Sequence, residues 1–286
     1  RVKHVTGVQT CALPIFDVPH CDSTVDVDGA AIHYLTWGEP GRPGLVFVHG
    51  GAAHAHWWTH VAAQFAGNYR VAALDLSGHG DSDRRDRYSL EKWTDEVIAV
   101  AAAADMAGPP IVIGHSMGGF VTLATAAGHP DRLAGGIVID SPVVRVDPEM
   151  DTGRRGNFRD PKVYPDAASA IARFRTVPAQ DHYEPFIMAD VAARSLRTCE
   201  GGVTWKFDPG IFIPERAAAD DLLPRITCRI ALFRAQHGLV TVDIGAYMYE
   251  QLGRVAPVVE IPLAGHNVML DQPLLLVTAQ IGRAHV

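Results

Sequence analysis

Short runs of apolar residues alternate with longer amphipathic segments along most of this chain. Four apolar runs, each with a Gly, Asp or Ser at or next to its last position, predict strands buried on both faces: GLVFVHG (44–50), RVAALDL (70–76), PIVIGHS (110–116) and GGIVID (135–140). RIALFRA (229–235) and PVVEIPLAG (257–265) predict two more strands, and helical patterns lie at about 57–66, 90–106 and 117–128. The alternation predicts an α/β fold, with a mostly parallel sheet and helices on both faces.

The pattern changes at the start and in the middle of the chain. STVDVDGAAIHYLTWG (23–38) predicts a hairpin that turns at Asp28-Gly29, so the sheet begins with antiparallel strands. From 141 to 214 the alternation stops, and Pro, Arg and aromatic residues become frequent. Two amphipathic helices are expected in YPDAASAIARFRTV (164–177) and EPFIMADVAARSLRT (184–198), and a loop in GGVTWKFDP (201–209). We interpret 141–214 as a helical cap between the core segments 16–140 and 215–280.

The two ends of the chain share an unusual relation. TCALPI (10–15) and IGRAHV (281–286) can be encoded by opposite strands of one short DNA sequence, and VTGVQTCALPI resembles a translated sequencing adapter. We therefore expect 1–15 and 281–286 to be non-native additions to an open reading frame assembled from fragmentary metagenomic DNA, with both natural termini missing.

Composition narrows the classes of partner. With 286 residues, 48% of them hydrophobic and 20% charged, the chain has ample material for one large α/β core. A net charge of -7 without a Lys or Arg cluster argues against nucleic acid as a partner. The longest apolar stretch, VIAVAAAADMA (97–107), is too short to span a membrane. The four scattered cysteines suggest reduced thiols and a cytoplasmic location.

The segment GHSMGG (114–119) carries the strongest chemical signal. It matches Gly-x-Ser-x-Gly between an expected strand and an expected helix, which is the context that a nucleophilic serine needs. Gly114 and Gly118 permit a turn so tight that the Ser116 hydroxyl projects clear of the backbone. The Met117 amide at the helix start would then face a developing oxyanion, together with the positive end of the helix dipole.

With this motif, the chain resembles the α/β-hydrolase superfamily, in its capped serine esterase and lactonase-like branch, over nearly all of 16–280. Three further segments carry the resemblance in the family's order: VFVHGG (46–51), DLSGHGDSD (75–83) and AGHNVMLDQP (264–273). The resemblance implies an eight-stranded, mostly parallel sheet with helices on both faces and a helical cap. It also implies that Gly51 supplies the second oxyanion amide and that no cofactor is needed.

His266 in the last of these segments is the candidate general base. Imidazole titrates near neutrality, so it can take the Ser116 proton and return it to the leaving group. The chain has 14 histidines, and His266 is distinguished by its loop near the end of the chain. His54 and His56 invite a metal site, but their i, i+2 spacing on an expected helix points them to different sides. We therefore expect no metal ion.

The carboxylate that should orient His266 is not where most relatives of this superfamily carry it. They have a Gly-x-x-Asp turn after the strand that precedes the histidine, whereas this chain has AQHG, with Gly238 in the Asp position. Asp140 is the preferred acid, because it ends a strand at the same sheet edge as Ser116 and some branches place their acid there. Asp243 and Glu250, on the next expected helix, are alternatives. A weakened or absent acid is another, because the oxyanion hole alone retains some activity.

A serine nucleophile implies an acyl-enzyme, which disfavours the dehalogenase and epoxide hydrolase reactions that use an Asp in this fold. The first hypothesis is a hydrolase of a small carboxylic ester or lactone. Alternatives are a carbon–carbon bond hydrolase using Arg154, Arg155 or Arg173, an aminopeptidase using Asp181 and Glu184, and a slow ligand-binding member of the superfamily. Residues that could line an acyl pocket, or simply pack the cap, are Phe158, Tyr164, Phe174, Tyr183, Phe186, Met188, Trp205 and Phe207.

Overall fold

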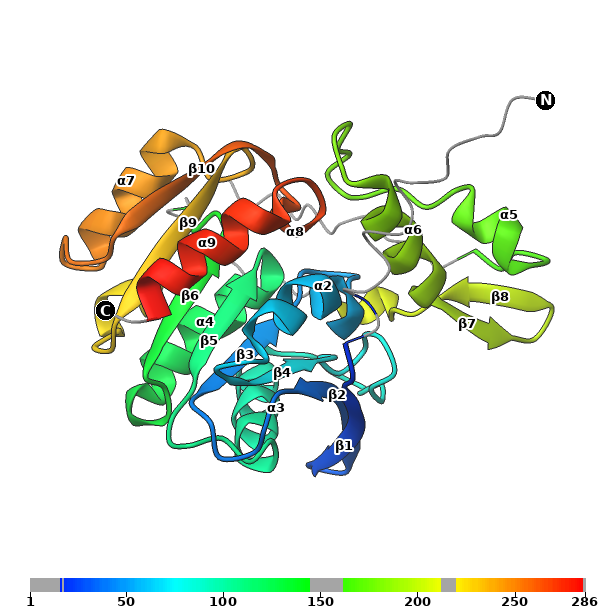
Figure 1. The fold of residues 1–286 in the computed structure, drawn as a ribbon, viewed down its shortest axis with the longest axis horizontal. Coiled ribbons are helices and arrows are strands. Elements are labelled where there is room, and N and C mark those ends of the chain that lie inside the picture. Colours follow the sequence, from blue (N-terminus) through cyan, green and yellow to red (C-terminus); the bar gives the residue numbers. More distant parts are fainter. Residues whose placement is uncertain (1–15, 17, 145–161, 212–219, 285–286) are drawn as a thin grey trace.

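The computed structural model describes residues 16, 18–144, 162–211 and 220–284 (Figure 1). Eight of its strands form one sheet in the order β1-β2-β4-β3-β5-β6-β9-β10. Their bounds are β1 Cys21–Val27, β2 Ala30–Trp37, β3 Gly44–Val48, β4 Arg70–Leu74, β5 Ile111–His115, β6 Gly135–Ile139, β9 Ile230–His237 and β10 Val258–Gly265. The β1–β2 and β2–β4 pairs are antiparallel and the other pairs are parallel, which confirms the expected sheet.

The hairpin at the start of the sheet turns where the sequence predicts. Val27 pairs with Ala30, and Asp28 and Gly29 between them have φ of 50° and 77°. Two successive positive φ values are typical of the two-residue turn that matches the twist of paired strands. The Asp-Gly dipeptide therefore sets the register of β1 on β2.

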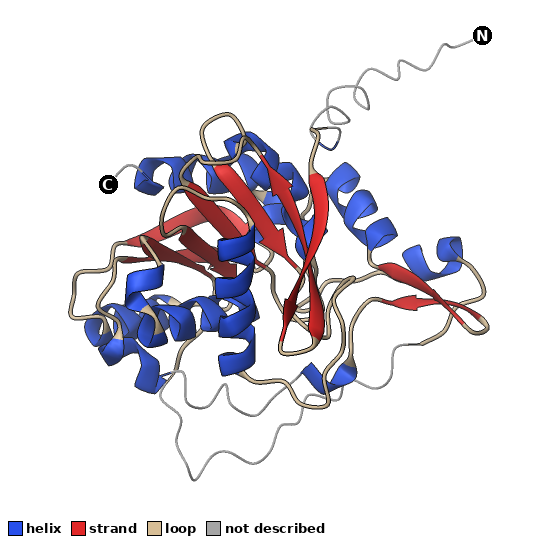
Figure 2. Ribbon diagram, turned by 90° about the horizontal axis from the view of Figure 1, so that it is seen from below, coloured by secondary structure: helices blue, strands red, loops and turns tan. Residues whose placement is uncertain are grey.

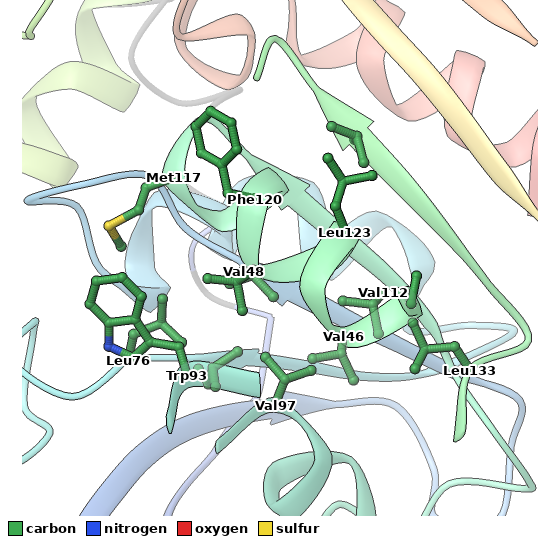
Figure 3. Close-up of a cluster of buried hydrophobic side chains, with 14 of the residues drawn as sticks. Val46, Val48, Leu76, Trp93, Val97, Val112, Met117, Phe120, Leu123 and Leu133 are labelled. Atoms are coloured by element: carbon green, nitrogen blue, oxygen red, sulfur yellow. The ribbon is translucent and has the colours of Figure 1, made fainter. Parts of the chain in front are cut away.

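Helices cover both faces of the sheet, as expected. Two clusters of buried side chains separate the faces: α3 (Leu90–Ala103), α4 (Met117–Gly128) and α7 (Val242–Gln251) contribute to one, and α2 (Thr59–Ala62), α8 (Val268–Asp271) and α9 (Pro273–Ala284) to the other. Alternate residues of β3 belong to opposite clusters, Val46 and Val48 to the first and Phe47 to the second. Figure 3 shows Trp93 and Phe120 in the first cluster, from α3 and α4. Burial on both faces explains the unbroken apolar runs.

The segment inserted between β6 and β9 mixes helices with strands. It contains α5 (Ala167–Ile171), α6 (Pro185–Arg194), β7 (Leu196–Cys199) and β8 (Gly202–Trp205). The loop expected over 201–209 is wrong in part, because β8 pairs with β7 in a hairpin that projects from the main sheet (Figure 2). The helix expected over 184–198 ends at Arg194, because the residues that follow it enter the hairpin.

Hydrogen bonds fasten the described part of the insertion to the core. Gly80 N donates to Lys206 O at 2.8 Å, and Asp208 N donates to Gly78 O at 2.8 Å, so the end of β8 is tied to the turn after β4. Before α6, Glu184 N donates to Leu270 O of α8 at 2.7 Å. The expected boundaries at 141 and 214 stay predictions, and the expectation for residues 1–15 lies outside the described residues. None of the helices in the described ranges is long and apolar enough to cross a membrane.

Candidate active site

The residues singled out in the sequence gather at one edge of the sheet. β3, β5, β6, β9 and β10 are parallel neighbours in the sheet, so their carboxyl ends share that edge. Gly51 follows β3, Ser116 follows β5, Asp140 follows β6 and His266 follows β10. The topology thus assembles four segments that are distant in the sequence.

Ser116 sits on the strained turn that the motif predicts. Its φ of 54° and ψ of -117° lie in a region that residues other than glycine rarely adopt. A Cβ on Gly114 would lie 2.1 Å from the Gly118 carbonyl oxygen, and one on Gly118 would lie 2.4 Å from the Val48 carbonyl oxygen. Both positions therefore require glycine, because α4 begins directly against β5 and β3. Ser116 N donates to Ile139 O at 3.0 Å, and the residue is half-buried.

The loop after β3 holds its peptide groups in a fixed orientation beside Ser116. A Cβ on Gly50 would lie 3.4 Å from Ser116 Cβ. His49 Nε2 accepts from Leu76 N at 3.1 Å, so its Nδ1 carries the hydrogen and donates to the Gly50 carbonyl at 2.7 Å. A trans peptide points its N–H opposite to its carbonyl, so His49 also sets the direction of the Gly51 N–H. The sequence analysis missed this role of His49.

Asp140 and His266 are joined by a buried hydrogen bond. His266 Nδ1 donates to Asp140 Oδ2 at 2.7 Å, and both side chains are buried. The carboxylate also accepts from Leu239 N at 2.7 Å, and from Ala235 N and Val240 N at 3.2 Å each. Burial alone raises the pKa of Asp140, but the hydrogen bonds from His266 and the backbone outweigh burial and hold that pKa below its usual value. Asp140 therefore remains a carboxylate at neutral pH.

Gly238, the position where an Asp was expected, faces this carboxylate. A Cβ on Gly238 would lie 2.2 Å from Asp140 Oδ2 and 2.4 Å from Oδ1, so the Asp140 carboxylate fills the space of a side chain there. Of the three candidate acids, Asp140 is the one bonded to His266 Nδ1. Asp243 lies in the first turn of α7, and Glu250 pairs with Arg254 at 2.6 Å on an exposed surface.

His115, which precedes Ser116, forms a hydrogen bond to the backbone of the His266 loop. Its Nε2 donates to the His266 carbonyl at 2.8 Å, and the two rings lie 4.6 Å apart between centroids. Burial, reinforced by the nearby His266, lowers the pKa of His115 to about 3, so this imidazole stays neutral. A neutral ring can donate from Nε2 without adding a positive charge beside His266.

Asp75 ties the loop after β3 to the turn after β4. Its carboxylate accepts from Ala55 N at 2.6 Å, from Asp81 N at 2.9 Å and from His33 Nδ1 at 2.7 Å. A Cβ on Gly80 would lie 2.1 Å from the Asp75 carboxylate, so the glycine makes room for the acid. This network explains the DLSGHGDSD segment, which was recognised in the sequence only as a family motif.

The imidazole of His33 carries a charge in this network. Its Nε2 bonds the exposed Asp22 at 2.7 Å, so carboxylates face both ring nitrogens. Burial lowers the pKa of His33, but hydrogen bonding and charge from Asp75, then Asp22, outweigh burial and raise it to about 9. An imidazolium in the folded state therefore stabilises the fold fully below about pH 6.5, the ordinary histidine value. That contribution is lost as the pH rises from 6.5 through 9.

We accordingly expect the parent protein to lose thermal stability between pH 6.5 and 9, and His33→Gln to remove most of this pH dependence. The variant should also be less stable at pH 6.5, by about 2 to 4 kcal/mol, because it leaves the buried Asp75 carboxylate without its charged partner. Thermal melts of both proteins at the two pH values measure the effect. Parallel pH dependence in parent and variant would contradict the assignment of charge to His33.

The two histidines that were considered as metal ligands, His54 and His56, form hydrogen bonds with protein side chains. His54 Nε2 bonds Ser195 Oγ at 2.9 Å and His56 Nδ1 bonds Thr59 Oγ1 at 3.3 Å, with the two rings 6.0 Å apart. Elsewhere in the described residues, donor atoms of His33, Asp75 and Asp81 lie within 4.8 Å of one another. Protein groups already contact all three. His33 bonds Asp75 and Asp22, and Asp75 also accepts from Asp81 N. The Asp81 carboxylate pairs with Lys206 at 2.5 Å.

The residues considered for alternative substrates differ in where they lie. Arg173, Asp181 and Glu184 are exposed. Arg154, Arg155 and Phe158 lie outside the described residues.

Among the aromatic candidates, the Phe174 and Trp205 rings lie 5.6 Å apart, and the Tyr164 and Trp205 rings lie 5.7 Å apart, which is the spacing of packed aromatic pairs. Packing within the insertion accounts for these contacts.

Comparison with known proteins decides the family. A model described as the alpha/beta hydrolase family matches residues 45–279, which include Gly51, Ser116, Asp140 and His266. The chain belongs to the alpha/beta hydrolase family. The expected superfamily is thereby confirmed.

Relatives within this family carry several activities in their names. Esterase Rv0045c of Mycobacterium tuberculosis is 26% identical over 88% of this chain and 85% of its own length, and Lipase LipV of the same organism is 26% identical over 85% and 93%. Mouse Epoxide hydrolase 4 is 31% identical, but the match spans only 43% of this chain and 35% of that protein.

Solved structures of the same fold superpose on nearly the whole chain. The structure of the M. tuberculosis esterase Rv0045c superposes with a TM-score of 0.76 at 23% identity, covering 97% of each chain. E-2-(acetamidomethylene)succinate hydrolase superposes with a TM-score of 0.81 at 18% identity, covering 94% of this chain and 100% of that one. At these identities, the likeness establishes the fold.

Proposed function

We propose that this alpha/beta hydrolase is a serine hydrolase that cleaves a carboxylic ester or lactone through an acyl-enzyme on Ser116. The observation that carries the proposal is the buried hydrogen bond from His266 Nδ1 to Asp140, at the sheet edge where Ser116 occupies its strained turn. A carboxylate on Nδ1 leaves Nε2 as the basic nitrogen of a neutral imidazole. That tautomer is the one that can accept a proton from a serine hydroxyl.

Each residue then has a defined role. Ser116 Oγ attacks the carbonyl carbon of the substrate while His266 Nε2 takes the hydroxyl proton, and Asp140 stabilises the imidazolium that forms. The N–H groups of Met117 and Gly51 donate to the oxyanion of the tetrahedral intermediate. Collapse of this intermediate breaks the bond to the alcohol oxygen, which receives the proton from His266. An ester releases its alcohol at this step, whereas the alcohol of a lactone stays attached to the acyl group. Water then attacks the acyl-enzyme by the same steps and frees the acid and Ser116.

The relatives support ester bonds over other substrates of this family. Proteins named as an esterase and a lipase match most of this chain, whereas the match to a protein named as an epoxide hydrolase covers less than half of it. Ser116 also favours acyl transfer, because an ester of serine with the substrate's acyl group is readily hydrolysed. The exposed positions of Arg173, Asp181 and Glu184 give less support to carbon–carbon bond hydrolysis or aminopeptidase activity.

Labelling with a fluorophosphonate probe tests the proposal, because the probe reacts with an activated serine. We expect stoichiometric labelling of the parent protein, no labelling of Ser116→Ala, and hydrolysis of p-nitrophenyl esters by the parent alone. Ser169→Ala, which changes another serine at the start of α5, is the matched control and should label like the parent. An unlabelled parent, or equal labelling of Ser116→Ala, would refute the proposed function.

A further inference from the structure

A glutamine of the inserted segment pairs with the backbone beside His266. Gln180 lies between α5 and α6, and its Oε1 accepts a hydrogen bond from Asn267 N at 2.9 Å. Its Nε2 donates to the Asn267 carbonyl at 3.4 Å and to the His182 carbonyl at 3.0 Å. One carboxamide therefore contacts both polar backbone groups of the residue that follows His266.

Gly265, which precedes His266, makes room for this contact. A Cβ on Gly265 would lie 2.7 Å from both Cδ and Oε1 of Gln180. That separation is too short for two side chains to share, so one of them must move. The backbone of Gly265 does not have the positive φ that favours glycine. Close approach of Gln180, rather than backbone conformation, therefore accounts for this glycine.

The core holds other polar groups of the same loop. Asp140 binds the His266 side chain and His115 binds its carbonyl. Leu270 N donates to the Asn267 carbonyl at 2.8 Å, so the Gln180 Nε2 contact with that carbonyl is an additional, longer one. The Asn267 N–H has its partner in Gln180. The inserted segment thus supplies one of the bonds that fix the peptide after His266.

We propose that Gln180 is a positioning residue for ester hydrolysis, which holds the Asn267 peptide so that the His266 imidazole stays aligned between Asp140 and Ser116. This inference rests on the proposed function, because alignment affects turnover only if His266 is the general base. A general base must remain within hydrogen-bond reach of the proton that it abstracts, and a displacement of about 1 Å can cost about a hundredfold in rate. Gln180 thereby couples the position of the insertion on the core to the reactivity of Ser116.

Removing the carboxamide tests the proposal. We expect Gln180→Ala to lower kcat on p-nitrophenyl butyrate by about tenfold to a hundredfold, with KM changed by less than about threefold. Gln180→Glu keeps an acceptor for Asn267 N–H and should recover most of the lost kcat. Gln236→Ala is the matched control, because Gln236 Oε1 accepts from Leu263 N at 2.7 Å on the strand that leads to the same loop. This control loses a similar bond without touching Asn267, and should keep the parental kcat.

A double-mutant cycle separates positioning from general destabilisation. Gly265→Ala should lower kcat in the parent, because the new Cβ displaces the Gln180 carboxamide. In the Gln180→Ala background the same change should have little further effect, because the space is already empty. If Gln180→Ala does not fold, Gly265→Ala and Gln180→Glu are compared with the parent. Gly265→Ala should then have a lowered kcat, and Gln180→Glu should keep most of the parental kcat.

The outcomes distinguish this inference from the function on which it rests. An active parent whose Gln180→Ala variant keeps kcat within twofold would overturn the positioning role and leave the hydrolase intact. Additive losses in the cycle, or a variant whose lowered thermal midpoint is its only change, would also overturn it. A parent that neither labels with fluorophosphonate nor hydrolyses esters would refute the proposed function, and the role of Gln180 with it.

Discussion

Replacing Asp140 with asparagine is expected to lower kcat on a short p-nitrophenyl ester by about three to four orders of magnitude. The amide nitrogen of the new side chain can donate to His266 Nδ1, which favours the tautomer with its hydrogen on Nε2 and disables the base. The other orientation keeps the oxygen toward His266 but forfeits the negative charge that stabilises imidazolium. Steady-state kinetics of Asp140→Asn and the parent measure the loss.

Loss of hydrogen bonds to the backbone adds a cost in stability. Asp140 accepts from three backbone N–H groups, and one asparagine oxygen cannot serve all of them. We expect the free energy of unfolding to fall by about 1 to 3 kcal/mol, so circular dichroism must first show that the variant is folded at the assay temperature. Asp243→Asn is the matched control and should stay within about twofold of the parent. Near-normal turnover by Asp140→Asn, with a large loss in Asp243→Asn, would move the acid to α7.

Placing an acid at Gly238, where most relatives of the superfamily are expected to carry it, should destabilise this protein. The new Cβ would overlap the Asp140 carboxylate, and a second buried negative charge would stand beside the first. We expect Gly238→Asp to lower the free energy of unfolding by about 3 to 5 kcal/mol and to reduce activity with it. Chemical unfolding of the parent, Gly238→Asp and Gly238→Ala separates overlap from charge, because alanine brings only the overlap.

Removing Asp140 from the same variant should reverse the effect. Asp140 has φ of 45°, a conformation that glycine adopts without strain, so Asp140→Gly is the suitable partner change. The double variant Asp140→Gly, Gly238→Asp should be more stable than the sum of its single changes predicts, and should turn over at least about tenfold faster than Asp140→Gly alone. A double variant no better than either single change would show that the two positions cannot exchange the acid.

The central strands and their helices were predictable because each is buried in a way that marks the sequence. β3, β5 and β6 lie between two layers, so nearly every residue is apolar and the runs stand out. The hairpin of β7 and β8 is short and partly exposed, so its residues carry little hydrophobic pattern. Its strands were mistaken for the end of a helix and for a loop, since pairing between the two strands is what determines their conformation.

The sequence by itself determined the alpha/beta hydrolase fold, the turn that presents Ser116, and the strand ends where Asp140 and His266 stand, because these depend on local patterns and on the order of motifs. Only the tertiary structure decided which carboxylate bonds to His266. It also showed that this carboxylate fills the space that a side chain at position 238 would occupy. It also revealed the links from Asp75 to the loop after β3 and from Gln180 to Asn267. The physical reason is distance along the chain, since Gln180 and Asn267 are 87 residues apart and no local pattern encodes a contact made through folding.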